Sequence, residues 1–237
     1  DEMASTPVKL IDDLTRVDNY KALFKEAFPD HVTSESSAIT IANVVSALAA
    51  FQTSLISLNS AYDRYALGDP SALTKNQVIG LNVFRSFVAR CSQCHTPPLF
   101  TNQQLAVIGT PEPEGLPRDV GAAKTFSSNK LRGAFKIPTL RNIANTSPYM
   151  HSGRFSSLRE AAEFYTKGRG HAVPENEKLN LHWHISEPNL SHDELDRLVD
   201  FMEALNDEAF MPVIPERVPS GLLTGLQPDI LATSSGD

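Results

Sequence analysis

Apolar residues recur at helical spacing in five stretches of the chain, and this pattern predicts a mostly helical protein. The predicted helices span residues 19–28, 41–58, 75–89, 158–166 and 192–205. Pro29 ends the first of these helices and Gly168 ends the fourth, because neither residue type continues a helix well.

Residues that favour helix N-caps stand directly before four of these stretches, at Thr40, Thr74, Ser157 and Ser191. Their side-chain oxygens accept hydrogen bonds from first-turn amides. The stretch after Thr40 is apolar on all sides, so we expect a core helix there. The buried faces of the third and fifth helices are predicted to carry Val78, Leu81, Phe84 and Val88, and Leu195, Leu198, Phe201, Met202 and Leu205.

The net charge and the hydropathy of the chain limit the kinds of partner that we expect it to bind. The chain has 237 residues and a net charge of -7, which argues against binding to nucleic acid or to anionic membrane surfaces. The same charge suits docking with a basic redox protein. No run of 18 apolar residues occurs, so we expect no membrane span.

The two cysteines of the chain stand three positions apart, and a histidine follows them directly, in the segment Cys91-Ser92-Gln93-Cys94-His95. This C-x-x-C-H pattern is the signature of covalent haem attachment. Each thiol adds across a haem vinyl group, and the adjacent histidine becomes the proximal ligand of the iron. The pattern predicts one covalently bound haem c.

Three other uses of the cysteine pair explain the pattern less well. A thioredoxin-like redox pair needs a βαβ context, and no strand pattern precedes Cys91. A structural zinc site needs four ligands, and no second Cys or His pair stands at finger spacing. A disulfide between Cys91 and Cys94 leaves His95 without a role. Haem attachment accounts for all three residues.

The helices and the haem motif together predict an all-α fold, a cytochrome c-like haem domain with additional N-terminal helices and long haem-wrapping loops. Residues 1–73 are predicted to be an N-terminal helical segment that packs on the haem domain, 74–210 the haem domain, and 211–237 an extended Pro-rich tail. Residues 96–136 are rich in Pro, Gly and polar residues and lack periodicity. We expect a long loop there that the haem helps to organise.

Haem attachment also bears on localisation. In bacteria it takes place outside the cytoplasm, so we expect a secreted protein, periplasmic or on the cell surface. The first residues, Asp1-Glu2-Met3-Ala4, lack the basic and apolar regions of a signal peptide. We therefore expect a mature or trimmed chain.

Several further blocks of sequence occur in a recognisable order. They are Ala61-Tyr62-Asp63-Arg64-Tyr65 with Gly68-Asp69, Gly80-Leu81-x-x-Phe84, Leu99-Phe100-Thr101, FKIPTLRN at residues 135–142 and PYMHSG at residues 148–153. With the haem motif, these blocks resemble the bacterial di-haem cytochrome c peroxidase and MauG family, specifically its C-terminal haem domain with the preceding linker helices. The resemblance covers about residues 20–205, and the last two blocks are its most specific part.

The resemblance implies an oxidoreductase. In that family peroxide oxidises one haem, which receives electrons through a second haem from a redox protein or a target side chain. This chain has one haem motif and begins where the peroxide-splitting domain would end. We expect it to hold or relay oxidising equivalents, with a second haem domain or redox protein as partner and hydrogen peroxide as oxidant. The alternative is a mono-haem c-type electron carrier without peroxidase chemistry; catalytic residues are not identified.

Three residues are candidates for the second axial ligand of the iron. The resemblance favours Tyr165, because the corresponding helix supplies a Met in similar peroxidases and a Tyr in MauG-like members. A tyrosinate stabilises ferric iron and lowers the reduction potential. Met150 would instead give a high-potential electron-transfer haem. His151 resembles a family residue near the haem propionates and is a candidate sixth ligand or hydrogen-bonding neighbour.

Arg141 and Lys136 are candidates for binding the haem propionates, and Thr146 and Pro148 are candidates for binding a metal ion. Arg141 and Lys136 need anionic partners if they are buried, and propionates are natural ones. The alternative is a surface charge or a salt bridge within the protein. Thr146 and Pro148 match positions whose backbone carbonyls bind an interdomain calcium ion in similar peroxidases. A Ca2+ site there is a further expectation from the resemblance.

The remaining histidines give a weaker signal. His182 and His184 lie on one side of an extended segment, where copper or zinc would find two ligands. Two ligands without others make a poor site, so we expect solvated or core histidines instead. His31, His171 and His192 belong to no recognisable pattern.

Overall fold

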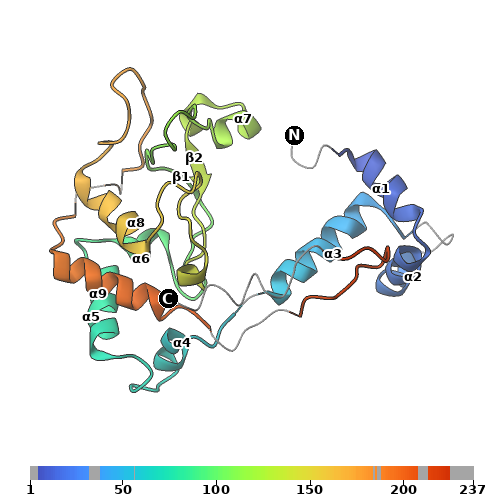
Figure 1. The fold of residues 1–237 in the computed structure, drawn as a ribbon, viewed down its shortest axis with the longest axis horizontal. Helices are drawn as coiled ribbons and strands as arrows, with labels where there is room; N and C mark the ends of the chain where they lie inside the picture. The colour runs from blue at the N-terminus through green and yellow to red at the C-terminus, as the bar shows by residue number, and fades with distance from the viewer. Residues whose placement is uncertain are drawn as a thin grey trace. The chain divides into compact units, whose positions relative to one another are not determined.

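A computed structural model describes residues 5–31, 38–55, 57–183, 185, 188–207 and 213–224. The chain divides into two compact units, the first comprising Asp1–Ile56 with Met211–Asp237 and the second Ser57–Phe210. Helices dominate the described part of both units (Figure 1), which confirms the predicted all-α class. The second unit contains the C-x-x-C-H motif and all the residues predicted for the haem site. The predicted boundaries at residues 73 and 210 stay predictions.

The described elements follow in chain order, with η denoting a 3-10 helix. The first unit contains α1 (Pro7–Thr15), α2 (Asp18–Ala27), η2 (Pro29–His31) and α3 (Ile41–Ser54). The second contains α4 (Ala61–Ala66), α5 (Lys75–Arg85), α6 (Cys91–Cys94), β1 (Leu105–Val107), α7 (Ala122–Phe126), η3 (Asn129–Leu131), β2 (Ala134–Lys136), η4 (Ile143–Asn145), α8 (Leu158–Phe164), η5 (Tyr165–Lys167) and α9 (His192–Glu203).

In the first unit, the predicted N-cap of α3 is confirmed, whereas its predicted burial on several sides stays a prediction. The Thr40 side chain accepts a hydrogen bond from the Asn43 amide, as an N-cap does. Within α3 only Asn43 and Val44 are buried, whereas Phe51 is 60% exposed. An apolar sequence favours burial but does not supply the partner that buries it. The helix also ends at Ser54, before the predicted residue 58.

The other elements of the first unit are short. The predicted helix at residues 19–28 is α2, which is shifted by one residue and is followed by Pro29 as expected. Helix α1, capped by Thr6, was not predicted. Residues 213–224 contain no helix, and Asn19 donates a hydrogen bond to the carbonyl of Pro219 at 3.0 Å. The rest of the predicted tail lies outside the described residues.

The core of the second unit lies where α5 crosses α9. Phe84, Phe100, Phe201 and Leu205 are almost completely buried there. Gly80 makes the crossing possible, because a Cβ at this position would lie 1.8 Å from the Arg197 carbonyl oxygen of α9. The glycine therefore allows the two helices to approach closely, and α5 leads directly towards α6.

Capping boxes begin the three helices of the second unit whose N-caps were predicted, α5, α8 and α9. In each, a hydroxyl accepts from the amide three residues on, and the side chain of that residue accepts from the cap amide. The pairs are Thr74 with Gln77, Ser157 with Glu160, and Ser191 with Glu194. All three predicted N-caps are thus confirmed, because caps depend on local sequence.

The third predicted helix is shorter than expected, and its predicted face is wrong at one position. Helix α5 ends at Arg85, because Ser86 adopts an extended conformation. Val88 is consequently 53% exposed and is not part of the inward face, whereas Leu81 and Phe84 are buried as predicted. The five positions of the predicted inward face of the last helix are all buried, although α9 ends at Glu203 and Leu205 lies just beyond it.

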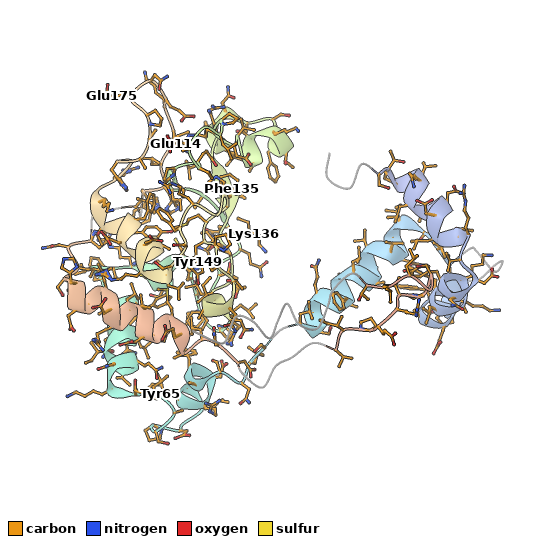
Figure 2. All side chains as sticks on the ribbon, viewed as in Figure 1. Tyr65, Glu114, Phe135, Lys136, Tyr149 and Glu175 are labelled. Atoms are coloured by element: carbon orange, nitrogen blue, oxygen red, sulfur yellow. The ribbon has the colours of Figure 1, made fainter. Side chains whose placement is uncertain are left out.

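Residues 96–136 contain more regular secondary structure than the predicted loop, because they include two short strands and two short helices. Strands β1 and β2 form an antiparallel pair in which Leu105 lies opposite Lys136 and Val107 opposite Ala134. Three-residue strands are too short to produce a readable alternation, and their pairing is not local in sequence. The pair positions Phe135 and Lys136 on β2, ahead of the loop that carries Tyr149 (Figure 2). No helix in the described part of the chain is long and apolar enough to cross a bilayer.

Candidate haem site

The C-x-x-C-H motif forms a single helical turn just after α5. Arg90 precedes α6 with a left-handed backbone (φ 56°), which turns the chain between the two helices. The His95 amide closes the turn on the Cys91 carbonyl at 2.9 Å. A single turn places two residues three apart on one side, so both thiols and the following ring lie within reach of one ligand.

The His95 imidazole is held by two backbone carbonyls. Its Nδ1 lies 3.1 Å from the Phe100 oxygen and 3.2 Å from the Pro138 oxygen. Carbonyl oxygens only accept, so Nδ1 carries the proton. Burial lowers the pKa of His95 and outweighs these hydrogen bonds, so the ring is neutral at pH 7. A neutral ring protonated at Nδ1 keeps its lone pair on Nε2, as an iron ligand requires.

The two cysteines are free, half-buried thiols. Burial raises the pKa of the Cys91 thiol to about 12, and burial also raises the pKa of Cys94. Both are therefore protonated at neutral pH, whereas metal ligands and redox nucleophiles are thiolates. In the part of the chain that the structure describes, no group of three or more His, Cys, Asp or Glu side chains is placed to hold a metal.

Tyr165 lies with the motif, although 70 residues separate them in sequence. It is the first residue of η5, directly after α8, and its ring packs edge-on against Phe164 at 5.3 Å between centroids. Burial raises the pKa of Tyr165 far above its usual value, and the nearby Cys91 and Cys94 thiols add to this rise. The structure thus places the half-buried Tyr165 close enough to both attachment cysteines for them to affect its pKa.

Met150 and His151 occupy the turn between β2 and α8. Met150 is half-buried and has a left-handed backbone (φ 68°). The His151 ring stacks on Phe135 with centroids 3.8 Å apart, and its Nε2 lies 2.9 Å from a carboxylate oxygen of Glu112. Glu112 therefore already occupies one ring nitrogen of His151. Axial ligation by Met150 or His151 stays a prediction.

Arg141 forms a salt bridge whose partner, Asp63, the sequence argument did not name. Its Nη1 and Nη2 donate to the two carboxylate oxygens of Asp63 at 2.8 and 2.7 Å, and its Nε donates to the Pro98 carbonyl at 2.8 Å. The guanidinium is buried, as predicted, but Asp63 balances its charge. This pair is the salt bridge that the sequence left open as the alternative, and a propionate contact by Arg141 stays a prediction. Lys136 is exposed, so the same argument does not apply to it.

The other predicted metal ligands receive no support from the described residues. Thr146 and Pro148 are exposed on the loop after η4, and the calcium site stays a prediction. His182 donates its amide to the Val107 carbonyl at 2.8 Å, and His184 lies outside the described residues, so the copper site stays untested. His171 contacts the Gly168 carbonyl through Nδ1 at 2.8 Å.

The residues of this site fit a haem c. Two thiols that form no disulfide and an Nε2 lone pair come from one helical turn, and the half-buried Tyr165 is close enough to both thiols for them to affect its pKa. Sequence reasoning missed the carbonyls of Phe100 and Pro138 that fix the His95 ring. Their only sequence signal is that they lie in the blocks Leu99-Phe100-Thr101 and FKIPTLRN, because backbone carbonyls leave no mark of their own.

Comparison with known proteins finds relatives among cytochrome c peroxidases and MauG proteins. The family profile described as di-haem cytochrome c peroxidase matches residues 1–71. The methylamine utilization protein MauG of Methylorubrum extorquens is 32% identical over 216 residues, which are 91% of this chain and 57% of that protein. Cytochrome c551 peroxidase of Nitrosomonas europaea is 28% identical over 218 residues, covering 90% of this chain and 58% of that protein. The chain thus spans less than two thirds of either relative.

Solved structures share the fold. A MauG-like protein associated with microbial copper homeostasis matches with a TM-score of 0.68 at 24% identity, covering 85% of this chain and 62% of the other. The diheme peroxidase BthA from Burkholderia thailandensis matches with a TM-score of 0.61 at 22% identity, covering 92% and 63%. Sequence and fold agree, and this chain belongs to the di-haem cytochrome c peroxidase/MauG family.

Proposed function

We propose that this chain carries one haem c, bound through thioethers to Cys91 and Cys94, with His95 and Tyr165 as the two axial ligands of the iron. The protein is a c-type haem oxidoreductase of the cytochrome c peroxidase/MauG type. It holds or relays oxidising equivalents outside the cytoplasm, in the periplasm or at the cell surface.

The orientation of His95 is the observation that carries this proposal. Two carbonyl acceptors at 3.1 and 3.2 Å fix the proton on Nδ1 and turn Nε2 away from them. Burial keeps the ring neutral. A proximal ligand gains basicity and a fixed ring plane from such acceptors.

Tyr165 supports a role in storing oxidising equivalents. A buried phenol resists ionisation, and the raised pKa of Tyr165 shows this effect. Its ionisation requires a nearby positive charge, because an unpaired buried anion is very costly. When bound, a haem supplies a redox-active iron whose ferric charge stabilises a tyrosinate. Tyr165 then favours the oxidised state and occupies the position that peroxide would need.

The partners follow from that occupied position. A chain with both axial positions filled by its own residues is suited to passing electrons, not to binding peroxide. We therefore propose a second haem centre or a redox protein as its partner, with hydrogen peroxide as the oxidant at the partner centre. This proposal applies to the part of the related proteins that the chain spans.

The test begins with the full chain produced in a bacterial periplasm that attaches haem c. One haem per chain, and a ferric spectrum without the weak far-red band of a His/Met haem, is the expected result. In Tyr165→Phe the iron should lose its anionic ligand, and its spectrum should change; in the control Met150→Leu it should not. A far-red band that Met150→Leu abolishes would replace this proposal with the mono-haem electron carrier.

A further inference from the structure

Two loops meet behind His95 and supply one acceptor each to its ring. Phe100 lies in the loop of residues 96–101, and Pro138 lies in the loop of residues 137–141. Thr101 Oγ1 donates to the Ile137 carbonyl at 2.6 Å, and Thr139 Oγ1 donates to the Leu99 carbonyl. These cross-links keep the two acceptors at a fixed spacing around one nitrogen.

Phe100 holds its carbonyl in an unfavourable backbone conformation. Its φ is 53°, in the left-handed region that a bulky side chain rarely adopts. Its fully buried ring contacts Tyr62, Phe84 and Phe201 edge-on or tilted, with centroids 4.9 to 6.2 Å apart. Such a conformation persists only where the surroundings impose it. The surroundings therefore decide where the Phe100 carbonyl points.

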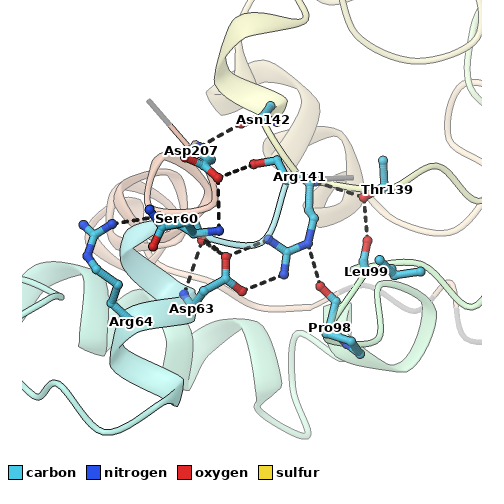
Figure 3. A network of polar contacts seen from close by, with 11 residues as sticks. Ser60, Asp63, Arg64, Pro98, Leu99, Thr139, Arg141, Asn142 and Asp207 are labelled. Carbon is cyan, nitrogen blue, oxygen red and sulfur yellow. Dashed lines mark hydrogen bonds and ion pairs between the residues drawn. The ribbon is translucent and has the colours of Figure 1, made fainter. Parts of the chain in front are cut away.

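Arg141 connects this loop to α4. Its Nε binds the Pro98 carbonyl at 2.8 Å, and its guanidinium lies 5.7 Å from the centre of the Phe100 ring. Its Nη1 and Nη2 atoms donate to the two carboxylate oxygens of Asp63. The Arg141 side chain is 5% exposed and the Asp63 side chain is 11% exposed. Figure 3 shows Arg141 between the Asp63 carboxylate and the Pro98 carbonyl.

Asp63 is itself fixed on α4. Its carboxylate accepts from the Ser60 amide at 2.8 Å and from the Ser60 hydroxyl at 2.6 Å, which closes a capping box. The neighbouring Asn142 side chain accepts from the Asp207 amide at 2.8 Å, so the 137–141 loop is tied at its end as well (Figure 3). None of these bonds touches the haem motif directly.

We propose that Asp63 and Arg141 are positioning residues that set the reduction potential of the haem iron by holding the two carbonyl acceptors of His95 in place. This inference rests on the proposed role of His95 as the proximal ligand. A firm Nδ1–H···O contact makes the imidazole a stronger electron donor, which stabilises the ferric state. Loosening the clamp weakens that donation, so the ferric state becomes easier to reduce.

The experiment measures the midpoint potential of the haem-loaded full chain by optical redox titration. The variants are Asp63→Asn, which keeps the shape of the side chain, and Arg141→Lys, which keeps the charge but not the fork. Each should shift the ferric/ferrous ratio about tenfold towards ferrous, or about 59 mV for one electron. Thr139→Val removes one cross-link and should give a smaller shift in the same direction.

Glu177→Gln is the matched control. Glu177 is a mostly buried carboxylate of the same unit that pairs with Arg118 and Arg132, and it has no contact with either loop among its described bonds. Its substitution should leave the potential unchanged.

The outcomes separate this proposal from the one on which it rests. A wild-type chain without covalent haem refutes the proposed function itself. A haem-loaded wild type whose potential stays the same in Asp63→Asn, Arg141→Lys and Thr139→Val refutes the clamp alone. If Asp63→Asn and Arg141→Lys fail to fold or to bind haem, Thr139→Val decides. An equal shift in Glu177→Gln also refutes the clamp, because the effect would then be general.

Discussion

Replacing Gly80 by alanine tests how the helix crossing positions the haem motif. An ideal Cβ at residue 80 would lie 1.8 Å from the Arg197 carbonyl oxygen and 2.8 Å from the Phe201 Cβ. The first contact is about 1.6 Å short of ordinary van der Waals separation. Because the obstructing atom is backbone, α5 and α9 must move apart.

The magnitude follows from two opposing effects. Overpacking of a close-packed core costs about 1–3 kcal/mol, and a backbone obstacle places this case near the upper value. Alanine in a helix interior is about 1 kcal/mol more favourable than glycine. The net expectation is a loss of about 2 kcal/mol in the free energy of unfolding. Helix propensity alone predicts the opposite sign, so the sign of the change distinguishes the two effects.

The assay is urea unfolding followed by far-ultraviolet circular dichroism, on wild type and variant in the same haem state. Asn82→Ala is the control, because Asn82 is exposed on the same helix. It should change stability by no more than about 0.5 kcal/mol. A Gly80→Ala protein as stable as wild type, or more stable, would refute the close crossing of α5 and α9.

Three further predictions address the site. Burial alone would raise the pKa of Asp63, but hydrogen bonds from Arg141 and Ser60 outweigh this effect and lower the pKa below 3.8. The ionised Asp63 therefore stabilises the folded protein above pH 3.8, and this stabilisation is lost as the pH falls through the lowered pKa. Asp63→Asn should therefore flatten the acid limb of a pH–stability curve, and an unchanged limb would contradict the pairing. Ser157→Ala removes the cap of α8 and should cost about 1 kcal/mol in urea unfolding, with no loss arguing against the cap. Tyr165→Phe should raise the haem potential in a redox titration, because an anionic ligand favours ferric iron; a lowered potential would exclude tyrosinate ligation.

Much of the second unit was predictable because its signals are local. Thr74, Ser157 and Ser191 begin helices through contacts within three residues, so their sequence context suffices. The inward face of α9 follows from its helical period. The C-x-x-C-H motif likewise depends on spacing within a single turn.

The errors arose where contacts between distant residues decide the outcome. The β1–β2 pairing joins residues about 30 apart, and Arg141 pairs with Asp63 across 78 residues. In both cases, the sequence of one segment does not identify the distant segment with which it pairs. For α5, the periodic pattern predicted an inward Val88, but the helix ends at Arg85 and Val88 is 53% exposed. The carbonyls of Phe100 and Pro138 that orient His95 were missed because they are backbone groups of other segments, one of them 43 residues away.

Covalent attachment of haem at Cys91 and Cys94 is the central claim, and one measurement tests it directly. The full chain, produced with haem-attachment machinery, is extracted with acidic acetone and then weighed by intact mass spectrometry. The account predicts that the colour stays with the protein, that the mass exceeds that of the polypeptide by one haem, and that a Cys91→Ala, Cys94→Ala double variant loses both. A colourless polypeptide of unmodified mass, with both thiols free, would contradict it.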